Sequence, residues 1–255
     1  MLVTAEIRDD IGVVTLNDPV HRNALSAAIV ADFLAALEET RRGRARAVVV
    51  TGAGPVFCAG ADVRGLLSAG WLEEPRGPTP LDIFRALGRE RRLVVAAVNG
   101  AAFGGGFELT LCADLVVAAE QASFAMPEVG LGVVPNTGLG KLPRLVGARK
   151  ALELALTRRR LTAAEALVLG LVNSVVPEAT LLEAAVALAR DVVTGAPPTA
   201  IAVAKESLNR HLACDWQEIA SALRRLDPKE WKEGLGAFLE RRPARYDRFW
   251  SARDD

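Results

Sequence analysis

Two patterns of apolar positions alternate along the first two thirds of the chain. One consists of short runs of consecutive apolar residues, which are typical of strands buried on both faces of a parallel sheet. These runs cover residues 47–50, 93–98, 115–118 and 172–176. The other pattern has a helical period and predicts helices over residues 62–68, 81–89, 105–112, 139–157 and 163–169. Strands alternating with helices predict an α/β fold.

The N-terminus and the C-terminal part depart from this alternation. Residues 4–8 and 12–16 are β-rich and are separated by Asp9-Asp10, which predicts a hairpin. Ser26 can cap a helix that follows it. After residue 178 the pattern is helical only, with predicted helices over residues 181–193, 200–212, 216–226 and 231–239. These helices need a surface to pack on, either the chain's own core or another subunit.

Composition excludes several classes of protein. Hydrophobic residues make up 51% and charged residues 24% of the 255 residues, as in a globular protein. Lys+Arg 31 balances Asp+Glu 31, so the basic excess of a general nucleic-acid binder is missing. Cys58, Cys112 and Cys214 lie far apart, which favours reduced thiols in a cytoplasmic protein. We find no signal peptide pattern and no apolar stretch long enough for a membrane span.

Generic catalytic and nucleotide-binding motifs fail on inspection. Gly138-Leu139-Gly140-Lys141 suggests a phosphate loop, but Pro135 and Leu142 replace the required Gly and Ser/Thr. The glycines at 104–106 do not extend to GxGxxG, and no GxSxG is present. The chain has two histidines, His21 in a loop and His211 in the helical tail. Surface or capping roles suit both, so neither a nucleophile–histidine system nor a metal site is predicted.

Two glycine-containing turns remain, each placed between a predicted strand and a predicted helix. The first is Phe57–Asp62, in which Asp62 can cap the next helix and Ala61 presents a nearly unhindered N–H. The second is Asn99–Gly106, whose three glycines at a helix start let a ligand approach free N–H groups. Two such donors can form an oxyanion hole. Either turn alone fits tight helix packing on a sheet equally well.

Two isolated carboxylates accompany these turns. Glu108 lies three residues after Gly105 and therefore on the same helix face, although a glutamate in a first turn also suits the helix dipole. Glu128 follows Pro127 among apolar neighbours, which would raise its pKa toward the operating pH; the alternative is a solvated loop residue. A carboxylate pair beside an oxyanion hole predicts proton transfer at carbon next to a carbonyl.

The ordered set of motifs resembles the crotonase superfamily, the enoyl-CoA hydratase/isomerase group. The similar segments, spread over residues 5 to 246, are Asn23-Ala24-Leu25, Phe57–Asp62, Asn99–Leu109, Ala113-Asp114, Phe124–Gly132, Ala204-Lys205 and Glu233–Pro243. The resemblance implies a spiral of ββα units over residues 1–195, containing the active site. It implies a C-terminal helical oligomerisation region over residues 196–255, used for packing into homotrimers or hexamers.

The resemblance also implies site residues and a reaction. Ala61 and Gly105 would donate backbone N–H groups to the thioester oxygen of an acyl-CoA. Glu108 would activate the water that adds to C3 of a 2-enoyl-CoA, and Glu128 would exchange the proton at C2. No metal or redox cofactor is then needed, because coenzyme A is part of the substrate. The implied binding residues for the substrate and its CoA part are Ala59, Gly60, Asp62, Val63, Gly104 and Arg241.

Some positions depart from the family pattern and leave the substrate open. The segment Pro135–Arg144 lacks the family's Thr-Gln pair, and Leu93 stands where the family usually has Pro. We expect the acyl pocket to vary in the segment Leu66–Pro80, which includes Trp71. Alternatives to hydration are double-bond isomerisation, C–C or thioester cleavage, and a non-catalytic homologue that binds CoA esters or RNA. Zero net charge disfavours RNA, and the two glutamates disfavour a non-catalytic protein.

Overall fold

The computed structural model describes residues 1–68, 77–212 and 214–250. The strands are β1 Val3–Arg8, β2 Ile11–Leu16, β3 Ala47–Gly52, β4 Val56–Cys58, β5 Leu93–Val98, β6 Ala101–Phe103, β7 Leu115–Ala119, β8 Ser123–Ala125, β9 Leu161–Thr162 and β10 Ser174–Val176. The α-helices are α1 Ala27–Arg42, α2 Val63–Ser68, α3 Pro80–Arg89, α4 Gly105–Cys112, α5 Thr137–Val146, α6 Ala148–Thr157, α7 Ala163–Val168, α8 Leu181–Gly195, α9 Pro198–Asn209, α10 Trp216–Arg224, α11 Pro228–Leu239 and α12 Asp247–Trp250. Short 3₁₀ segments η1 Pro19–His21, η2 Glu128–Leu131, η3 Glu178–Thr180 and η4 Arg210–Leu212 connect them.

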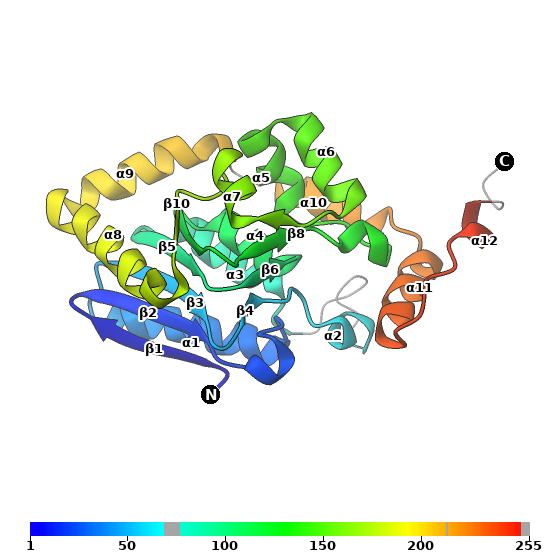
Figure 1. Ribbon diagram of the computed structural model, residues 1–255, viewed down its shortest axis with the longest axis horizontal. Helices are drawn as coiled ribbons and strands as arrows, with labels where there is room; N and C mark the ends of the chain where they lie inside the picture. Colours follow the sequence, from blue (N-terminus) through cyan, green and yellow to red (C-terminus); the bar gives the residue numbers. More distant parts are fainter. Residues whose placement is uncertain (69–76, 213, 251–255) are drawn as a thin grey trace.

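The main sheet has the strand order β1-β2-β3-β5-β7-β10 and is parallel apart from the β1–β2 hairpin (Figure 1). Asp9 and Asp10 form the predicted hairpin turn, both with positive φ (49° and 67°), the conformation that two-residue hairpins favour. The apolar runs of β3 and β5 are buried on both faces. Alternate residues of these strands face α8 on one side and α1, α3 and α4 on the other.

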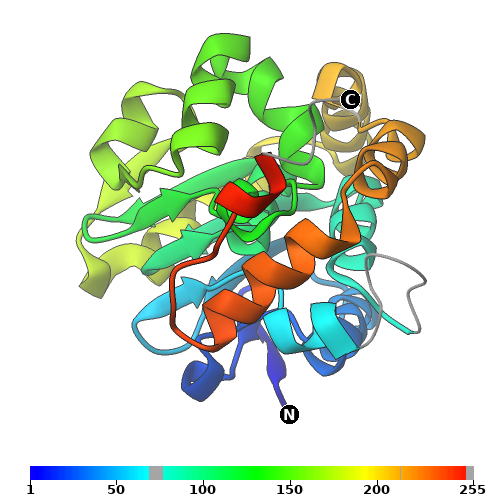
Figure 2. The ribbon, with the colours of Figure 1, turned by 90° about the vertical axis from the view of Figure 1, so that its right-hand side faces the viewer.

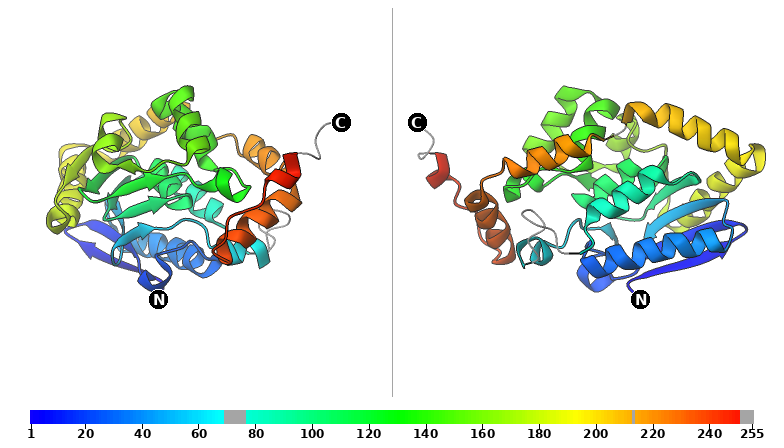
Figure 3. Two further views of the ribbon diagram at one scale, coloured as in Figure 1. Left: turned by 45° about the vertical axis from the view of Figure 1, so that its right-hand side comes forward. Right: turned by 180° about the vertical axis from the view of Figure 1, so that it is seen from behind.

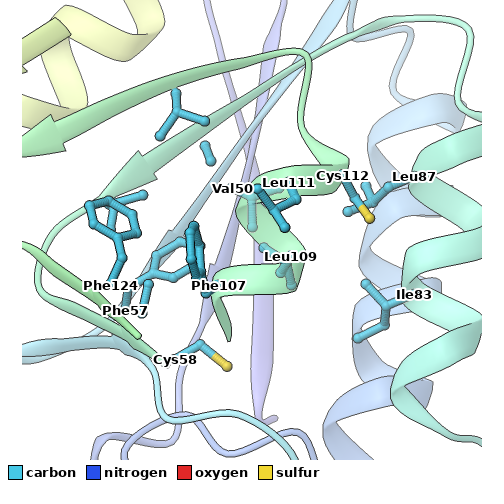
Figure 4. Packing of buried hydrophobic residues seen from close by; sticks show 14 of the residues in the cluster. Val50, Phe57, Cys58, Ile83, Leu87, Phe107, Leu109, Leu111, Cys112 and Phe124 are labelled. Atoms are coloured by element: carbon cyan, nitrogen blue, oxygen red, sulfur yellow. The ribbon is translucent and has the colours of Figure 1, made fainter. Parts of the chain in front are cut away.

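A second, smaller sheet with the order β4-β6-β8-β9 carries the site. Each of its first three strands follows a strand of the main sheet after a short turn, and a helix comes after the pair. This repetition of β3-β4-α2, β5-β6-α4 and β7-β8-α5 confirms the expected ββα units of the spiral. Phe57, Phe107 and Phe124 pack together where α4 covers this sheet, and the rings of the last two lie 5.4 Å apart (Figure 4).

The prediction of one helix over residues 139–157 is wrong. The structure has two helices, α5 and α6, separated at Gly147, whose φ of 79° takes the chain out of helical conformation. The apolar period continues across this break because both helices pack on the same core. Ser26 caps α1 as predicted, accepting a hydrogen bond from Ile29 N at 3.3 Å.

The C-terminal helices differ in where they pack. α8 covers one face of the main sheet, and α9 contacts β5 and η4. α10 contacts α5 and lies beside α3, where the Arg85 guanidinium lies over the Trp216 ring (Figure 3). Figure 2 shows α11 crossing one end of the molecule beside α2. Trp231 and Leu235 of α11 form a small apolar cluster with Val133 and with residues of α2, so α11 covers the loop that contains Glu128.

Candidate active site

The first turn, residues 59–62, leads from β4 to α2, and a buried asparagine positions the start of it. Asn23 is fully buried, and its amide donates to the carbonyl oxygens of Ala53 (3.0 Å), Val56 (2.8 Å) and Phe57 (3.2 Å). Its carbonyl oxygen accepts from Asp18 N at 2.9 Å. One side chain thus satisfies four backbone groups and fixes β4 relative to the chain before α1.

Two backbone hydrogen bonds of Leu25 hold the rest of the turn in place. Its N–H donates to Gly60 O at 2.7 Å, and its carbonyl accepts from Asp62 N at 3.3 Å. Ala61 lies between these two bonded residues. Gly60 has a φ of 99°, which a residue with a side chain rarely adopts. The Asp62 carboxylate accepts from Arg64 N and from Gly65 N at the start of α2, so the predicted cap is confirmed.

The second turn ends at Gly104, which precedes α4. Gly104 has φ 53° and ψ −125°, and its N–H donates to Ala125 O at 2.9 Å. This backbone conformation is almost restricted to glycine. It directs the N–H of Gly105, the first residue of α4, out of the helix, where the helix supplies no acceptor.

The two turns bring the Ala61 and Gly105 amides together. A Cβ atom added to Gly105 would lie 3.4 Å from Ala61 N, and one added to Gly60 would lie 3.2 Å from Gly105 N. Neither N–H has a hydrogen-bond acceptor among the residues that the structure describes. Two adjacent free donors at a helix start are the geometry that stabilises an oxyanion.

Glu108 is held by donors at the start of α5. Its Oε1 accepts from Gly138 N at 2.8 Å and from the Thr137 hydroxyl at 3.1 Å, and the residue is only 1% exposed. Burial raises the pKa of Glu108, and the bonds from Gly138 and Thr137 oppose this rise. The N-terminus of α5 adds a favourable field for the carboxylate.

Glu128 begins η2 and faces the second turn. A Cβ atom added to Gly104 would lie 3.1 Å from Glu128 Oε1. Its Oε2 is buried and has no partner among the described residues. Burial, together with the nearby charge of Glu108, raises the pKa of Glu128 to about 8. A buried carboxyl oxygen without a partner next to a free donor pair indicates a place for a ligand or water.

The two carboxyl groups therefore form an asymmetric pair. Each disfavours the charge of the other, so the pair holds one proton near neutral pH. Glu108 Oε1 accepts two hydrogen bonds, whereas Glu128 Oε2 has no partner among the described residues, and this difference favours the negative charge on Glu108 and the proton on Glu128. The arrangement can accept one proton and donate another beside a single oxyanion hole.

The other predicted binding residues fall into two groups. Ala59, Gly60, Asp62 and Val63 lie on the first turn or at the start of α2, within four positions of Ala61. Arg241 lies after α11 with an exposed side chain, which makes no hydrogen bond or ion pair with any described residue. Trp71, in the predicted acyl segment, lies outside the described residues.

Sequence reasoning missed Thr137 and Gly138 as partners of Glu108. They are 29 and 30 positions away along the chain, and the segment Pro135–Arg144 stood out only as a departure from the family pattern. The signal that could have found them is a Thr-Gly pair at a helix start, since free N–H groups there suit a carboxylate.

Neither a metal-binding cluster nor a membrane-spanning helix is present in residues 1–68, 77–212 and 214–250. No group of three or more His, Cys, Asp or Glu side chains is placed to bind a metal there. None of the helices in the described part of the chain is both long and apolar enough to cross a membrane.

Comparison with known proteins agrees with this geometry. A family model described as enoyl-CoA hydratase/isomerase matches residues 6–248. A probable enoyl-CoA hydratase of Rhizobium meliloti (strain 1021) is 36% identical over 252 residues, covering 94% of this chain and 96% of the relative. The short-chain-enoyl-CoA hydratase of Clostridium acetobutylicum is 35% identical over 252 residues, covering 94% and 95%.

Solved structures match over nearly the whole chain as well. The carnitinyl-CoA hydratase of Mycobacterium avium has a TM-score of 0.81 at 36% identity, with 97% of this chain and 98% of that chain covered. The enoyl-CoA hydratase of Bacillus anthracis has a TM-score of 0.73 at 30% identity, with 96% and 99% covered.

Proposed function

The chain belongs to the enoyl-CoA hydratase/isomerase family, and from this membership and the site geometry we propose that it adds water to a 2-enoyl-CoA thioester. The product is the 3-hydroxyacyl-CoA. One observation carries the proposal: two free backbone N–H groups converge beside the buried Glu108 and beside Glu128, whose Oε2 is buried. The reaction uses coenzyme A as part of the substrate and needs no other cofactor.

The Ala61 and Gly105 N–H groups bind the thioester oxygen in this proposal. Electron density moves onto that oxygen as water attacks C3, so donors placed there stabilise the enolate-like state more than the substrate. Each such donor contributes about 3 kcal/mol to lowering the barrier. Gly60, Gly104 and the two backbone hydrogen bonds of Leu25 keep both donors in place.

The glutamates divide the proton transfers. Glu108, ionised and held by Thr137 and Gly138, takes a proton from the water whose oxygen bonds to C3. Glu128, protonated at neutral pH, donates its proton to C2 as the double bond is consumed. After one turnover Glu108 carries the proton and Glu128 the charge, so a proton returns between them, directly or through solvent.

The presence of both carboxylates supports hydration over double-bond migration. Isomerisation only moves one proton along the acyl chain and has no use for a second group that activates water. In this site the second group, Glu108, is buried and hydrogen bonded, which supports the role proposed for it in activating the water that adds to C3.

The proposal is tested by mixing the purified protein with 2-enoyl-CoA thioesters of several lengths and following loss of the conjugated-thioester absorbance. Glu108→Gln and Glu128→Gln keep the shape of each side chain and should each lower kcat/KM by about 10²–10⁴-fold. Protein that binds CoA thioesters but leaves every enoyl-CoA unchanged would refute hydration. Unchanged rates in both variants would refute the assigned roles.

Three further proposals concern the binding of CoA, the assembly of the protein and its location. We propose that Ala59, Asp62 and Val63 contact the CoA part and that Arg241 reaches one of its phosphates. The protein is proposed to form a homotrimer or a dimer of trimers in the cytoplasm. Apolar side chains exposed on α6, α7 and α9, among them Leu156, Val168 and Leu208, support assembly because a monomer leaves them in water.

A further inference from the structure

A cavity of about 530 Å³ lies behind the glutamate pair, between α3, α5, η4 and α10. Thr137 belongs to both places, since it donates to Glu108 and also lines this cavity. Cys112 and Cys214 line it too. In Figure 4, Cys112 at the end of α4 points toward Leu87 of α3, which is another lining residue.

One face of α4 leads from the oxyanion hole to this cavity. Gly105, Glu108 and Cys112 lie at positions i, i+3 and i+7 and therefore on one side of the helix. From Gly105 to Cys112 the helix rises about 10 Å, at about 1.5 Å per residue. An extended carbon chain advances about 1.3 Å per bond, since three backbone bonds span about 3.8 Å. An acyl chain that follows this face, with its carbonyl at Gly105 N and its C3 beside Glu108, would reach the cavity at about its eighth carbon.

The cavity is positively charged. Its lining includes six cationic side chains, Arg85, Arg89, Arg91, Lys141, Lys205 and Arg210, and three acidic ones, Glu90, Asp114 and Glu206. Two of the acidic groups are already neutralised: Glu90 by Arg41 and Arg92, and Asp114 by Lys205 at 2.6 Å. The lining residues Lys141, Arg89 and Arg210 make no ion pair within the described part of the chain.

Lys141 is the cationic lining residue on the same helix as Thr137. It lies on α5, four positions after Thr137, and its charge and that of Glu108 both act on the buried thiol of Cys112. Burial is the main cause that raises the pKa of Cys112 to about 12; the Lys141 charge opposes this rise, and the Glu108 charge adds to it. Lys141 thus lies one helical turn from Thr137, the residue that both lines the cavity and donates to Glu108. It belongs to the segment that departs from the family pattern.

Resting on the proposed function, we infer that this cavity binds an anionic group at the far end of the acyl chain, so that the preferred substrate is an ω-carboxy-2-enoyl-CoA of about eight carbons. Lys141 pairs with the distal carboxylate where the acyl chain enters the cavity. A cationic distal group, such as the trimethylammonium of a carnitinyl thioester, is repelled by the same side chains.

The test compares two matched pairs of probes on the wild-type enzyme. The first pair is 2-octenedioyl-CoA and 2-octenoyl-CoA, whose hydration is followed by loss of the conjugated-thioester absorbance. The second is suberyl-CoA and octanoyl-CoA, which lack the double bond and are measured by calorimetric binding. We expect at least tenfold higher kcat/KM and tenfold tighter binding for the carboxylated member of each pair. Equal values in both pairs would overturn the inference.

Lys141→Met removes the positive charge and keeps much of the length of the side chain. It should reduce the carboxylate preference in both pairs at least fivefold, mainly through KM and Kd. Lys150→Met, on α6 and away from the cavity, is the matched control and should keep the wild-type preference. An unchanged preference in Lys141→Met, or an equal loss in Lys150→Met, would also overturn the inference.

The two proposals fail in different ways. If 2-octenoyl-CoA is hydrated and no carboxylate preference exists, only the assignment of the cavity is wrong. If neither enoyl-CoA is hydrated but suberyl-CoA still binds more tightly than octanoyl-CoA, hydration is wrong and the assignment of the cavity stands.

Discussion

The hydroxyl of Thr137 offers a narrow way to perturb Glu108 without removing it. Thr137→Val replaces the hydroxyl by a methyl group of similar volume in a fully buried position. Glu108 keeps the Gly138 N–H bond of 2.8 Å and loses the Thr137 bond of 3.1 Å. We predict that the variant folds normally. Its ionised Glu108 carboxylate, the proposed catalytic base, is stabilised less than in the wild type.

The size of the effect follows from the bond that is lost. A hydrogen bond to a charged group contributes about 1.5–3 kcal/mol. Because the lost bond favours the ionised carboxylate, the pKa of Glu108 rises further in the variant, and its basic form is depleted as the pH falls. At neutral pH, kcat/KM should fall at least about tenfold, since about 1.4 kcal/mol corresponds to a factor of ten. Raising the pH should restore part of the loss.

The assay is the pH profile of kcat/KM for a 2-enoyl-CoA, measured for both proteins between pH 5 and 9. Thr110→Val is a matched control, because Thr110 is a buried threonine of α4 whose hydroxyl donates to Phe107 O instead of Glu108. The acid limb of the profile should move to higher pH in Thr137→Val only. An unmoved limb, or an equal shift in the control, would refute the role given to the Glu108 hydrogen bonds.

Three further predictions follow from the described contacts. Since Glu128 acts in its protonated form and its pKa is about 8, kcat/KM of the wild type should fall as the pH rises through about 8; a profile flat to pH 10 would contradict this. Burial tends to raise the pKa of Glu90, but Arg92 together with Arg41 outweighs it and lowers the pKa to about 2. The ion pairs of Glu90 therefore stabilise the fold above about pH 4.5, and this stabilisation is lost as the pH falls toward 2. Glu90→Gln should lower the free energy of unfolding by about 2 kcal/mol at pH 6 and much less near pH 2. Asn23→Ala should lower the free energy of unfolding, measured with urea, by at least about 2 kcal/mol, because buried backbone groups lose their hydrogen-bond partner.

The sequence predicts the centre of the main sheet well because β3 and β5 are six residues long and consist largely of buried apolar residues. The runs at 47–50 and 93–98 became β3 and β5, paired in parallel as the buried pattern indicates. The second sheet left no comparable signal, since β4, β6 and β8 have three residues each, too few for a period to show. The break at Gly147 was missed because the helical period continues across it.

The four residues proposed for the site could be picked out from the sequence. The contacts that hold them in place could not. Ala61, Gly105, Glu108 and Glu128 stood out because each occupies a turn or an apolar setting where its chemistry is unusual. The hydrogen bonds of Thr137 and of Leu25 join segments that are about 30 or more positions apart. Such pairs meet only once the chain is folded.

The division of work between the two glutamates is tested most directly by exchange of the C2 proton, separated from water addition. Butyryl-CoA, which has no double bond to hydrate, is incubated in D₂O near pH 9 with each protein, and deuterium at C2 is followed by NMR. In this proposal Glu108→Gln keeps the exchange while losing hydration of a 2-enoyl-CoA, and Glu128→Gln loses both. Exchange that persists in Glu128→Gln and disappears in Glu108→Gln would contradict the roles assigned to the pair.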